Sequence, residues 1–491
     1  MKLLILLIII HQNLAAKILF TADSISPSHL MSMMPFAHRL VENGHQVTAY
    51  IELFKYQPIS PNLTEKVIVI KDQELHKFFV DDSGFEQLWH GEYRAYLLDG
   101  AWDAGLTVAN FMLTNMSAEF WEIANEKWDL IVVDSLFTVS AMVQALHNHE
   151  TPRIIFHTSH LEPPFAQIRQ LFWSLVDSPP TFVSQQTGAW LVDNFWDRLY
   201  GAWESWTFNF VYFNLVEGRI RSTIPFGHFT FHRWVNGASI SLIDYIDRLG
   251  WPLPVSRQQI YVGASCSTPK PLSDDLEDFV NSSLSSGTIL IAFGNSMDWN
   301  RIPKKDLQVF IDAFALLEEF RILWTYNGPK LNLPKHVRTV SWLPQTDLLY
   351  HHKTKLFLSH GGLKSLKEVI CAEVPALYMP IFAEQIRNSF LAHKHGFGEL
   401  INKKKLNRAE MVSKIRRMAS DSAYKMNVKK AKAVYLDRIV DPLDEAAFWA
   451  EKMLKSTKLK QFLTPKRVVL CIEYYYCVLF IFAAIFTHTL S

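Results

Sequence analysis

Short apolar runs alternate with longer amphipathic stretches in the first third of the chain. Four runs have the length and composition of buried strands, at 17–21, 46–51, 130–133 and 153–156. The stretch 29–43 has the character of a helix, and Gly44 closes it. Strand, helix and strand in this order indicate a βαβ unit of a parallel sheet, whose ligands bind beyond the carboxyl ends of the strands.

The same alternation begins again after a change of composition in the middle of the chain. Prolines, the acidic run 274–278 and the serines of 282–286 predict a linker over 256–286. Strands are then expected at 288–293, 321–325, 339–340 and 355–358, and helices at 304–317 and 363–372. This order predicts a second doubly wound α/β half.

One segment, 161–232, is rich in aromatic residues but irregular in period. Tryptophans recur in it, among them Trp173, Trp196, Trp203 and Trp206. Such a segment can line an apolar pocket, rest on a membrane surface or form a helical subdomain by ordinary packing. The pattern alone leaves these three interpretations open.

Both ends of the chain carry apolar segments. A basic start, an apolar run and the small pair Ala15-Ala16 predict a signal peptide over 1–16, because the apolar run is too short to span a bilayer. The stretch 468–490 contains one acid, Glu473, and has the length of a membrane-spanning helix. Basic residues precede this stretch and none follows it, so an interfacial or buried C-terminal helix stays an alternative.

Charge and cysteine usage narrow the possible functions. The 49 basic and 48 acidic residues give a formal net charge of +1, which offers nucleic acid no electrostatic footprint. Of the four cysteines, Cys266 and Cys371 lie outside the apolar tail, so a disulfide framework is not expected to hold the fold. Three triplets fit the pattern for N-glycosylation in a secretory lumen, at Asn62, Asn115 and Asn281.

Candidate chemistry begins at the stretch FLSHGGLKSLKEV, residues 357–369. A predicted strand passes through His360, Gly361 and Gly362 into a predicted helix. The free N–H groups of a helix start bind phosphate, and glycines let the backbone approach the ligand. His360 can donate to a diphosphate oxygen, and Glu368 can accept from ribose hydroxyls. A simple tight turn is the alternative interpretation.

Neighbouring loops supply the other parts of a nucleotide-sugar site. Trp342 offers a flat ring for stacking a nucleobase, and Gln345 offers an amide for base or ribose edges. Glu384 and Gln385 follow a further strand-like run. Asn295 and Ser296 follow the strand expected at 288–293, so we expect them at the same edge of the sheet.

These residues together resemble the signature of UDP-glycosyltransferases, and specifically the membrane-bound UDP-glucuronosyltransferase branch of animals. The resemblance lies in Trp342-Leu343-Pro344-Gln345, His360-Gly361-Gly362, Glu368, and 380–385 with Asn388. It implies a GT-B fold: two doubly wound Rossmann-like α/β domains that face each other, followed by a C-terminal membrane helix. UDP-sugar would be a co-substrate, and the resemblance implies neither a cofactor nor a metal.

The resemblance also sets the expected domain boundaries. They are a signal peptide at 1–16, an acceptor-binding half at 17–255, a linker at 256–286, a UDP-sugar-binding half at 287–440, a helical segment at 441–467 and the membrane helix at 468–490.

By the same resemblance, His29 matches the general base of the family and Asp134 matches the aspartate that orients it. The chemistry supports this assignment, because an acceptor hydroxyl attacks the sugar well only if a base of near-neutral pKa removes its proton. A carboxylate on the other ring nitrogen fixes the tautomer and stabilises the imidazolium that forms. Both residues follow predicted strands of one sheet. Decoration of a helix start and a helix cap are the alternatives.

Three residues of the candidate site depart from the family pattern. Lys364 stands where asparagine is usual, Glu384 replaces aspartate, and Asn295 stands where serine or threonine is commoner. These changes bear on the choice of sugar and on turnover. The basic retrieval tail of relatives is missing, which bears on retention in the endoplasmic reticulum.

The sequence therefore predicts an inverting glycosyltransferase that moves a hexose or hexuronate from UDP-glucose or UDP-glucuronate to a hydroxyl of a small lipophilic acceptor. An ungapped comparison finds no arginine matching that of glucuronate-using relatives within 242–251, which slightly favours glucose. The protein is expected in the endoplasmic reticulum membrane as a single-pass protein with lumenal domains, as a homo- or hetero-oligomer or alone. The alternative function is a non-catalytic relative that binds UDP-sugar or a lipophile and modulates a partner.

Overall fold

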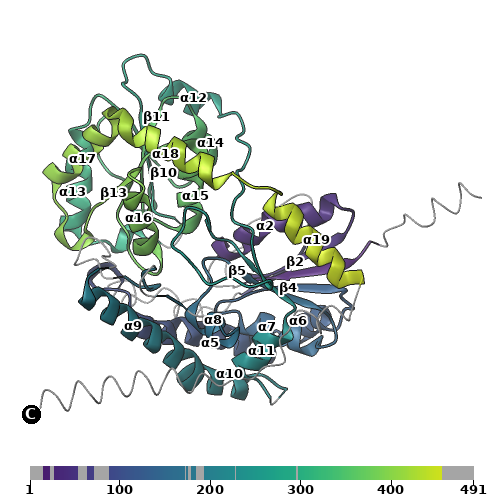
Figure 1. The fold of residues 1–491 in the computed structure, drawn as a ribbon. Coiled ribbons are helices and arrows are strands. Elements are labelled where there is room, and N and C mark those ends of the chain that lie inside the picture. Colours follow the sequence, from purple (N-terminus) through teal and green to yellow (C-terminus); the bar gives the residue numbers. More distant parts are fainter. Residues whose placement is uncertain are drawn as a thin grey trace, which may run out of the picture.

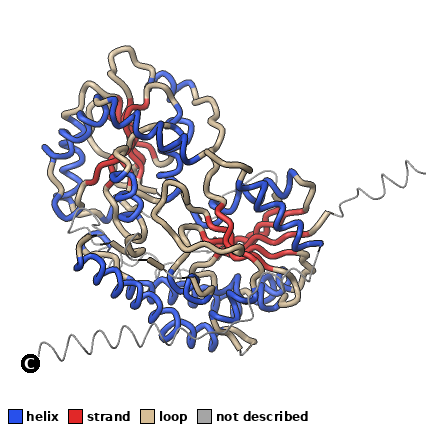
Figure 2. Tube along the Cα trace, in the orientation of Figure 1, coloured by secondary structure: helices blue, strands red, loops and turns tan. Residues whose placement is uncertain are grey.

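The computed structural model describes residues 15–22, 27–53, 63–70, 88–171, 173–174, 178–183, 193–226, 228–294 and 297–455. Asn295, Ser296, Asn62, nearly all of the expected signal peptide and the stretch 468–490 lie outside these residues. Within the described residues, no helix is both long and apolar enough to cross a membrane. Figures 1 and 2 show two sheets, each with helices around it.

The N-terminal half contains a seven-stranded sheet in the order β3-β2-β1-β4-β5-β6-β7, and every neighbouring pair is parallel. Its strands are β1 (Lys17–Thr21), β2 (Gln46–Leu53), β3 (Thr64–Val69), β4 (Leu130–Asp134), β5 (Arg153–His157), β6 (Ile240–Ile243) and β7 (Gln259–Tyr261). β4 and β5 are buried at every position, as expected for strands with helices on both faces. β7 lies within the stretch predicted as a linker. Because it pairs with β6, it belongs to the N-terminal sheet, and the N-terminal half extends beyond residue 255.

Helices cover both faces of this sheet. They are α2 (Pro27–Glu42), α5 (Leu98–Thr114), α6 (Ser117–Ala124), α7 (Val139–His147), α8 (Pro163–Ile168), α9 (Phe195–Phe210), η2 (Val211–Val216, a π-helix), α10 (Glu217–Thr223) and α11 (Phe231–Gly237). The aromatic segment supplies α8 to α11, which line the lower side of the molecule in Figure 1. Its described part is thus a helical layer, one of the three interpretations that the pattern left open.

The C-terminal half contains a six-stranded parallel sheet in the order β10-β9-β8-β11-β12-β13. Its strands are β8 (Thr288–Ala292), β9 (Arg321–Thr325), β10 (Val337–Val340), β11 (Thr354–Ser359), β12 (Ala376–Tyr378) and β13 (Gly398–Leu400). Its helices are α13 (Lys304–Ala315), α14 (Gln345–Tyr350), α15 (Leu363–Ala372), α16 (Gln385–Lys394), α17 (Arg408–Ser420) and α18 (Ser422–Tyr435). The prediction of two doubly wound α/β halves is confirmed.

The chain passes between the halves twice, at neighbouring places. The first passage follows β7 and includes α12 (Asp274–Val280), and the second leads from α18 into α19 (Pro442–Lys455). α19 returns to the N-terminal half, where Asn43 Nδ2 donates to Glu451 Oε1 at 2.9 Å. Tyr435 joins the passages: its hydroxyl donates to Gly263 O and accepts from Ser265 N at 3.2 Å.

One disulfide joins Cys266 of the first passage to Cys371 of α15. This single bond is not a disulfide framework, which the cysteine content argued against, but its pairing was not predicted from the sequence. The bond ties the connection between the halves to the helix that follows His360-Gly361-Gly362.

Candidate active site

The predicted base and its partner meet at the carboxyl edge of the N-terminal sheet. β1 and β4 are neighbours, with Thr21 beside Val133, so the loop after β1 and the end of β4 lie together. His29 lies in the first turn of α2, and Asp134 is the last residue of β4. His29 Nδ1 is 2.6 Å from Asp134 Oδ2. The His29 side chain is 17% exposed and that of Asp134 is fully buried, so the pair opens to a ligand only on the histidine side.

The contact fixes which ring nitrogen of His29 can act as a base. A carboxylate accepts hydrogen bonds, so Nδ1 carries a hydrogen, and Nε2 is the nitrogen that can accept a proton when the ring is neutral. Asp134 is itself held, because the backbone N–H of Leu136 donates to its Oδ1 at 3.3 Å and the hydroxyl of Thr138 donates to its carbonyl at 3.0 Å. The pair is therefore held by contacts within the N-terminal half.

The two glycines after β11 occupy positions where a side chain would clash with neighbouring atoms. Gly361 has φ of +89°, and a Cβ there would lie 2.5 Å from Ser389 Oγ and 2.8 Å from Gln385 O. A Cβ at Gly362 would lie 2.6 Å from His360 Nε2. Side chains at either place would push apart the turn, α16 and the histidine ring. The turn is fixed further because Asn388 Nδ2 donates to Gly361 O at 3.1 Å.

The His360 ring lies beside Gly294 and Gly362. Burial lowers the pKa of His360 to about 4, although an interaction with the Ala292 backbone opposes this shift. The ring is therefore neutral at neutral pH. Its Nδ1 is buried and has no hydrogen-bond partner in the described part of the chain. A buried polar atom without a partner, beside a helix start, suits a ligand that supplies the missing bond.

Glu368, the predicted ribose acceptor, is already engaged. Gln345 Nε2 and Thr346 Oγ1 each donate to one of its carboxylate oxygens at 2.5 Å. Gln345 also reaches Ser365 Oγ at 3.3 Å. Burial raises the pKa of Glu368, and the two hydrogen bonds act against that shift. The structure thus brings Gln345 and Glu368 together, as predicted, with Thr346 as a third member that was not predicted.

Trp342 stands apart from this network. It follows β10 in a loop, and 74% of its surface is exposed. Most other tryptophans of the described chain are buried, so packing does not explain this position. An exposed ring at the carboxyl edge of the sheet is available for stacking against a base.

Glu384 and Gln385 differ in what their side chains contact. Gln385 is buried, and its Oε1 accepts from the backbone N–H groups of Ile381 and Phe382 at 2.9 and 3.1 Å, which holds the loop. Burial raises the pKa of Glu384, while the nearby charges of His29 and Arg387 oppose this shift. Glu384 therefore faces the N-terminal half near His29, and Gln385 shapes the loop that carries it.

Lys364 points into a partly buried region between the halves. Burial lowers the pKa of Lys364 to about 8, with Asp244 acting in the opposite direction. The next turn of α15 bridges the halves directly, because Lys367 Nζ donates to Asp244 Oδ1 at 2.5 Å. Asp244 follows β6 at the carboxyl edge of the N-terminal sheet. Its place directly after the apolar run 240–243 could have identified it from the sequence, but it was not predicted.

Arg387 is a further residue that sequence reasoning missed. It belongs to α16 and is fully buried, and it reaches into the N-terminal half. Its guanidinium donates to Tyr245 OH at 2.9 Å and to Ser178 Oγ at 2.7 Å. No pattern in the sequence separates this arginine from an exposed one, because its partners come from distant parts of the chain.

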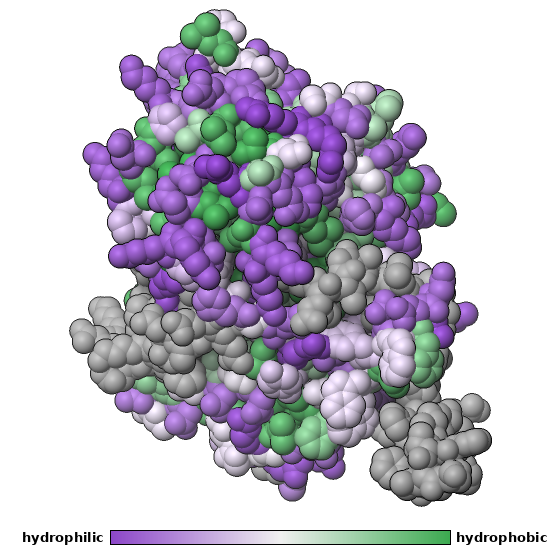
Figure 3. Space-filling view, turned by 90° about the vertical axis from the view of Figure 1, so that its left-hand side faces the viewer, coloured by the Kyte–Doolittle hydropathy of each residue, from purple (hydrophilic) through white to green (hydrophobic). Residues whose placement is uncertain are grey.

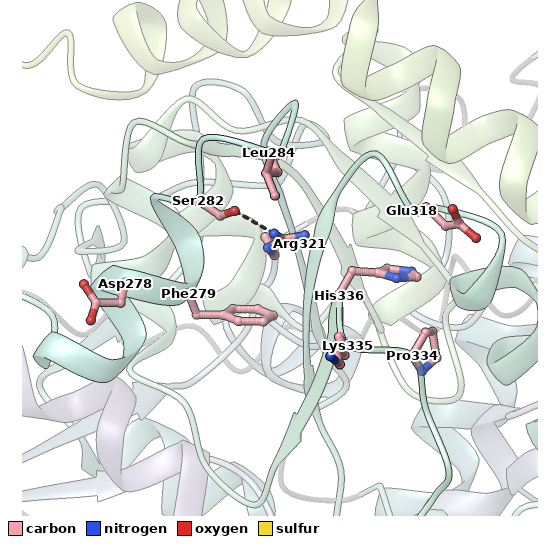
Figure 4. A pocket seen from close by; sticks show the side chains of 9 residues that line it. All are labelled: Asp278, Phe279, Ser282, Leu284, Glu318, Arg321, Pro334, Lys335 and His336. Atoms are coloured by element: carbon pink, nitrogen blue, oxygen red, sulfur yellow. Dashed lines mark hydrogen bonds between the residues drawn. The ribbon is translucent and has the colours of Figure 1, made fainter.

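A surface hollow elsewhere on the C-terminal half is a different feature (Figure 4). Arg321, Glu318, Lys335 and His336 are among its lining residues. Arg321 is the first residue of β9, and His336 immediately precedes β10, so the hollow lies at the amino edge of the sheet. It is therefore on the opposite edge from Trp342 and His360. Among the described residues, no group of three or more His, Cys, Asp or Glu could hold a metal ion.

Comparison with solved structures identifies the fold. The glycosyltransferase of kitacinnamycin superposes with a TM-score of 0.58 at 17% identity, over 90% of this chain and 99% of that one. The calicheamicin glycosyltransferase CalG4 gives 0.55 at 15% identity, over 90% and 99%. These likenesses, with the two facing parallel sheets, establish the GT-B fold.

Comparison with curated sequences gives relatives in animals. A UDP-glucuronosyltransferase of Pleuronectes platessa is 36% identical over 42% of this chain and 44% of its own length. UDP-glucuronosyltransferase 1-2 of Mus musculus is 32% identical over 42% of this chain and 39% of its own length. The matches thus span less than half of these relatives. Residues 16–464 match the family described as "UDP-glucoronosyl and UDP-glucosyl transferase", and the chain belongs to that family.

Proposed function

We propose that the protein transfers a glycosyl group from a UDP-sugar to a hydroxyl of a small lipophilic acceptor. The observation that carries this proposal is the His29–Asp134 pair, bonded at 2.6 Å with its open side near Glu384 of the other half. A base held at a boundary between two halves suits a reaction in which each half binds one substrate.

In the proposed step, the acceptor O–H gives its proton to Nε2 of His29 while its oxygen forms a bond to the anomeric carbon. The bond from that carbon to the diphosphate oxygen breaks, and UDP leaves with the electron pair. Asp134 stabilises the imidazolium that forms. Because the acceptor attacks from the side opposite UDP, the configuration of the sugar is inverted.

The donor would lie along the carboxyl edge of the C-terminal sheet. Trp342 would stack on uracil, and Glu368 with Gln345 would bind the ribose. The diphosphate would lie at the start of α15, where backbone N–H groups, neutral His360 as a hydrogen-bond donor, and Lys364 converge. Asn295 and Ser296, which lie outside the described residues, stay predictions for the same ligand.

Aromatic side chains near Glu384 support a lipophilic acceptor. The ring centroid of Tyr93 is 5.2 Å from that of Phe182 and 6.0 Å from that of Phe382. Burial, followed by the charge of Glu384, raises the pKa of the Tyr93 hydroxyl. UDP-glucose and UDP-glucuronate are the donors we propose, with no cofactor.

We also propose a lumenal position in the endoplasmic reticulum membrane, with a signal peptide at 1–16 and an anchor at 468–490. Two of the three glycosylation triplets, those at Asn115 and Asn281, lie within the described residues, and their exposure is compatible with glycosylation in the lumen. Asn115 ends α5 and Asn281 ends α12, and both are exposed. The test treats the parent chain and the triple variant Asn62→Gln/Asn115→Gln/Asn281→Gln with glycosidase and compares their electrophoretic mobility. We expect the mobility of the parent to change and that of the variant to stay the same. An unchanged mobility of the parent would contradict the lumenal position.

A second candidate function, binding of UDP-sugar without turnover, rests on Lys364. Its ammonium is partly buried where relatives place an amide, and the pKa near 8 indicates that charge there is disfavoured without a ligand. The intact His29–Asp134 pair favours catalysis over this alternative.

The test separates the two functions. Membranes that contain the full chain are incubated with UDP-glucose or UDP-glucuronate and a panel of phenols and sterols, and both UDP release and glycoside are measured. We expect glycoside formation that falls by about 10²–10⁴-fold in His29→Ala and is unchanged in His149→Ala, a matched change at an exposed histidine. Equal activity of His29→Ala and the parent would overturn the mechanism, and UDP binding without any glycoside would favour the second function.

A further inference from the structure

Helix α9 has its acidic and aromatic residues on unexpected sides. Its buried positions are Asp197, Gly201, Glu204 and Phe208. Its exposed large residues are Phe195, Trp196, Leu199, Trp203, Trp206 and Phe210. Positions three or four apart share a face of a helix, so these six residues form a ridge along the outside, named here the aromatic ridge. A helix on a water-facing surface normally has the reverse arrangement.

Internal contacts hold α9 in this orientation. Glu204 accepts from the backbone N–H of Ala95 at 2.9 Å and from Arg94 Nη1 at 3.4 Å. On the same buried side, the ring centroid of Phe208 is 5.5 Å from that of Phe182 and 5.3 Å from that of Tyr212. Rotating the helix to hide its tryptophans would break these contacts. The outward direction of the aromatic ridge is therefore a property of the fold.

The aromatic ridge is concentrated as well as exposed. Of the twenty large apolar residues that are exposed in the described chain, six lie on this one helix. The exposed tryptophans of the described chain are Trp196, Trp203 and Trp206 of α9 and Trp342 of the loop after β10. The ring of Trp206 lies 5.3 Å from those of both Trp203 and Phe210. Figure 3 shows green and pale side chains on the lower part of the face turned to the viewer, the side on which α9 lies.

The composition of the ridge favours one occupant. Tryptophan and phenylalanine prefer the boundary between headgroups and acyl chains, where an apolar ring and a polar N–H are both accommodated. A projecting ridge also differs from the apolar groove into which a peptide helix binds.

The charges beside the ridge favour the same occupant. Past its C-terminal end, Arg233 is an exposed base, and its neighbour His232 lies against Phe213, which follows α9. Two of the acids of this layer, Asp197 and Glu204, are buried, and Glu217 is paired with Arg221 Nη2 at 3.0 Å. Asp193 at the other end is the exposed acid of this described stretch. An exposed arginine near aromatic residues, with few exposed acids beside it, suits a surface that meets anionic lipid headgroups.

We propose that α9 lies flat on a lipid bilayer, with the aromatic ridge inserted by about 5–10 Å into the interfacial region. This contact is separate from any anchor formed by 468–490 and belongs to the N-terminal half. It does not depend on the proposed transferase activity, because it rests on the surface of α9 alone.

The test uses the full chain in vesicles of phosphatidylcholine and phosphatidylserine. A fluorophore is attached at Trp206→Cys in a Cys471→Ser/Cys477→Ser background, and its quenching by doxyl-labelled phosphatidylcholine is measured. Leu316→Cys is the matched control, since Leu316 is 50% exposed and Trp206 is 44% exposed, but Leu316 ends α13 in the C-terminal half. We expect several-fold stronger quenching at 206 than at 316. Equal quenching at the two positions would overturn the proposal.

Two other occupants give distinct results. Disulfide-linked dimers of unlabelled Trp206→Cys on mild oxidation, with no lipid quenching, would assign the ridge to a second copy of the chain. A crosslink from position 206 to Cys471 or Cys477 in the native background would assign it to the apolar tail. Either result overturns the bilayer contact. Where Trp206→Cys fails to bind UDP as the parent does, Trp196→Cys replaces it, because Trp196 is 71% exposed on the same ridge.

Discussion

The two halves of the molecule prepare their parts of the site in different ways. In the N-terminal half, His29 and Asp134, the residues proposed as base and orienting carboxylate, are bonded to each other at 2.6 Å. In the C-terminal half, the polar residues proposed to bind the ribose are hydrogen-bonded to one another, because Glu368 accepts from both Gln345 and Thr346. His29 is thus held by one carboxylate of its own half, whereas the Glu368 carboxylate is shared by two donors of its own half.

The two histidines of the site show the same contrast. His29 has a buried carboxylate on one nitrogen, which favours the imidazolium that forms during proton transfer. His360 has no such carboxylate among the causes of its shift, and burial lowers its pKa to about 4. In the proposed reaction, one ring therefore gains a proton and the other stays neutral and donates a hydrogen bond. A count of histidines in the sequence cannot separate these roles.

The strongest way to break the comparison is to disturb the prepared pair. Asp134→Asn keeps the shape of the side chain but can donate to Nδ1 of His29, which favours the wrong tautomer. We expect turnover to fall by about 10³–10⁴-fold, with UDP affinity unchanged. Initial rates of glycoside formation and calorimetric titration with UDP check the two parts. A similar loss of UDP affinity would mean that the pair also organises the donor half.

The disulfide allows a test of how α15 is held to the connection between the halves. Cys266 and Cys371 are 105 residues apart, and a loop of that length stabilises by about 4–5 kcal/mol in the chain-entropy account. Cys266→Ser is expected to lower the melting temperature and to increase proteolysis around α15. Cys371→Ser and the double variant should match it, since each removes the same bond. Stability that differs between the single variants would point to packing instead of the crosslink.

Glu368 tests whether internal hydrogen bonds compete with the ligand. Glu368→Gln removes the charge that should accept from ribose, so we expect UDP affinity to fall by about tenfold to a hundredfold, since hydrogen bonds to charged groups contribute about 1.5–3 kcal/mol. Thr346→Val, which removes one internal donor, should leave UDP affinity equal or tighter. Both are measured by titration with UDP. Weaker binding in Thr346→Val would show that Thr346 supports the carboxylate and does not compete for it.

The smallest expected effect is a pH dependence from Lys364. Because its pKa is about 8 in the unliganded protein, the ammonium loses its charge as pH rises through that value. UDP is an anion, so its affinity should fall by a few-fold between about pH 7 and about pH 9, the range that brackets this shifted lysine pKa. Lys364→Met should bind UDP more weakly at the lower pH and lose the slope. An unchanged slope in that variant would assign the titration to another group.

The sequence predicted the strands that appear as continuous apolar runs, as expected where both faces are covered, and β1, β9 and α15 begin and end where expected. The strands β3, β6, β7 and β13 were not predicted. It placed His29 and Asp134 at one sheet edge, but their pairing needed the resemblance to a family. The direction of Gln385 into its own loop and the burial of Arg387 depend on contacts between distant segments. Local pattern does not encode such contacts. For α9, a period search fails because the inward residues include two acids.

The two passages of the chain between the halves have a mechanical consequence. They are bonded to each other through Tyr435, Gly263 and Ser265, and Arg438 of the second passage pairs with Asp247 of the N-terminal half at 2.8 Å. The passages are therefore coupled, so that a displacement of one strains the other. The Cys266–Cys371 disulfide carries that strain into α15, and the stability of this helix thus depends on the contacts of Tyr435.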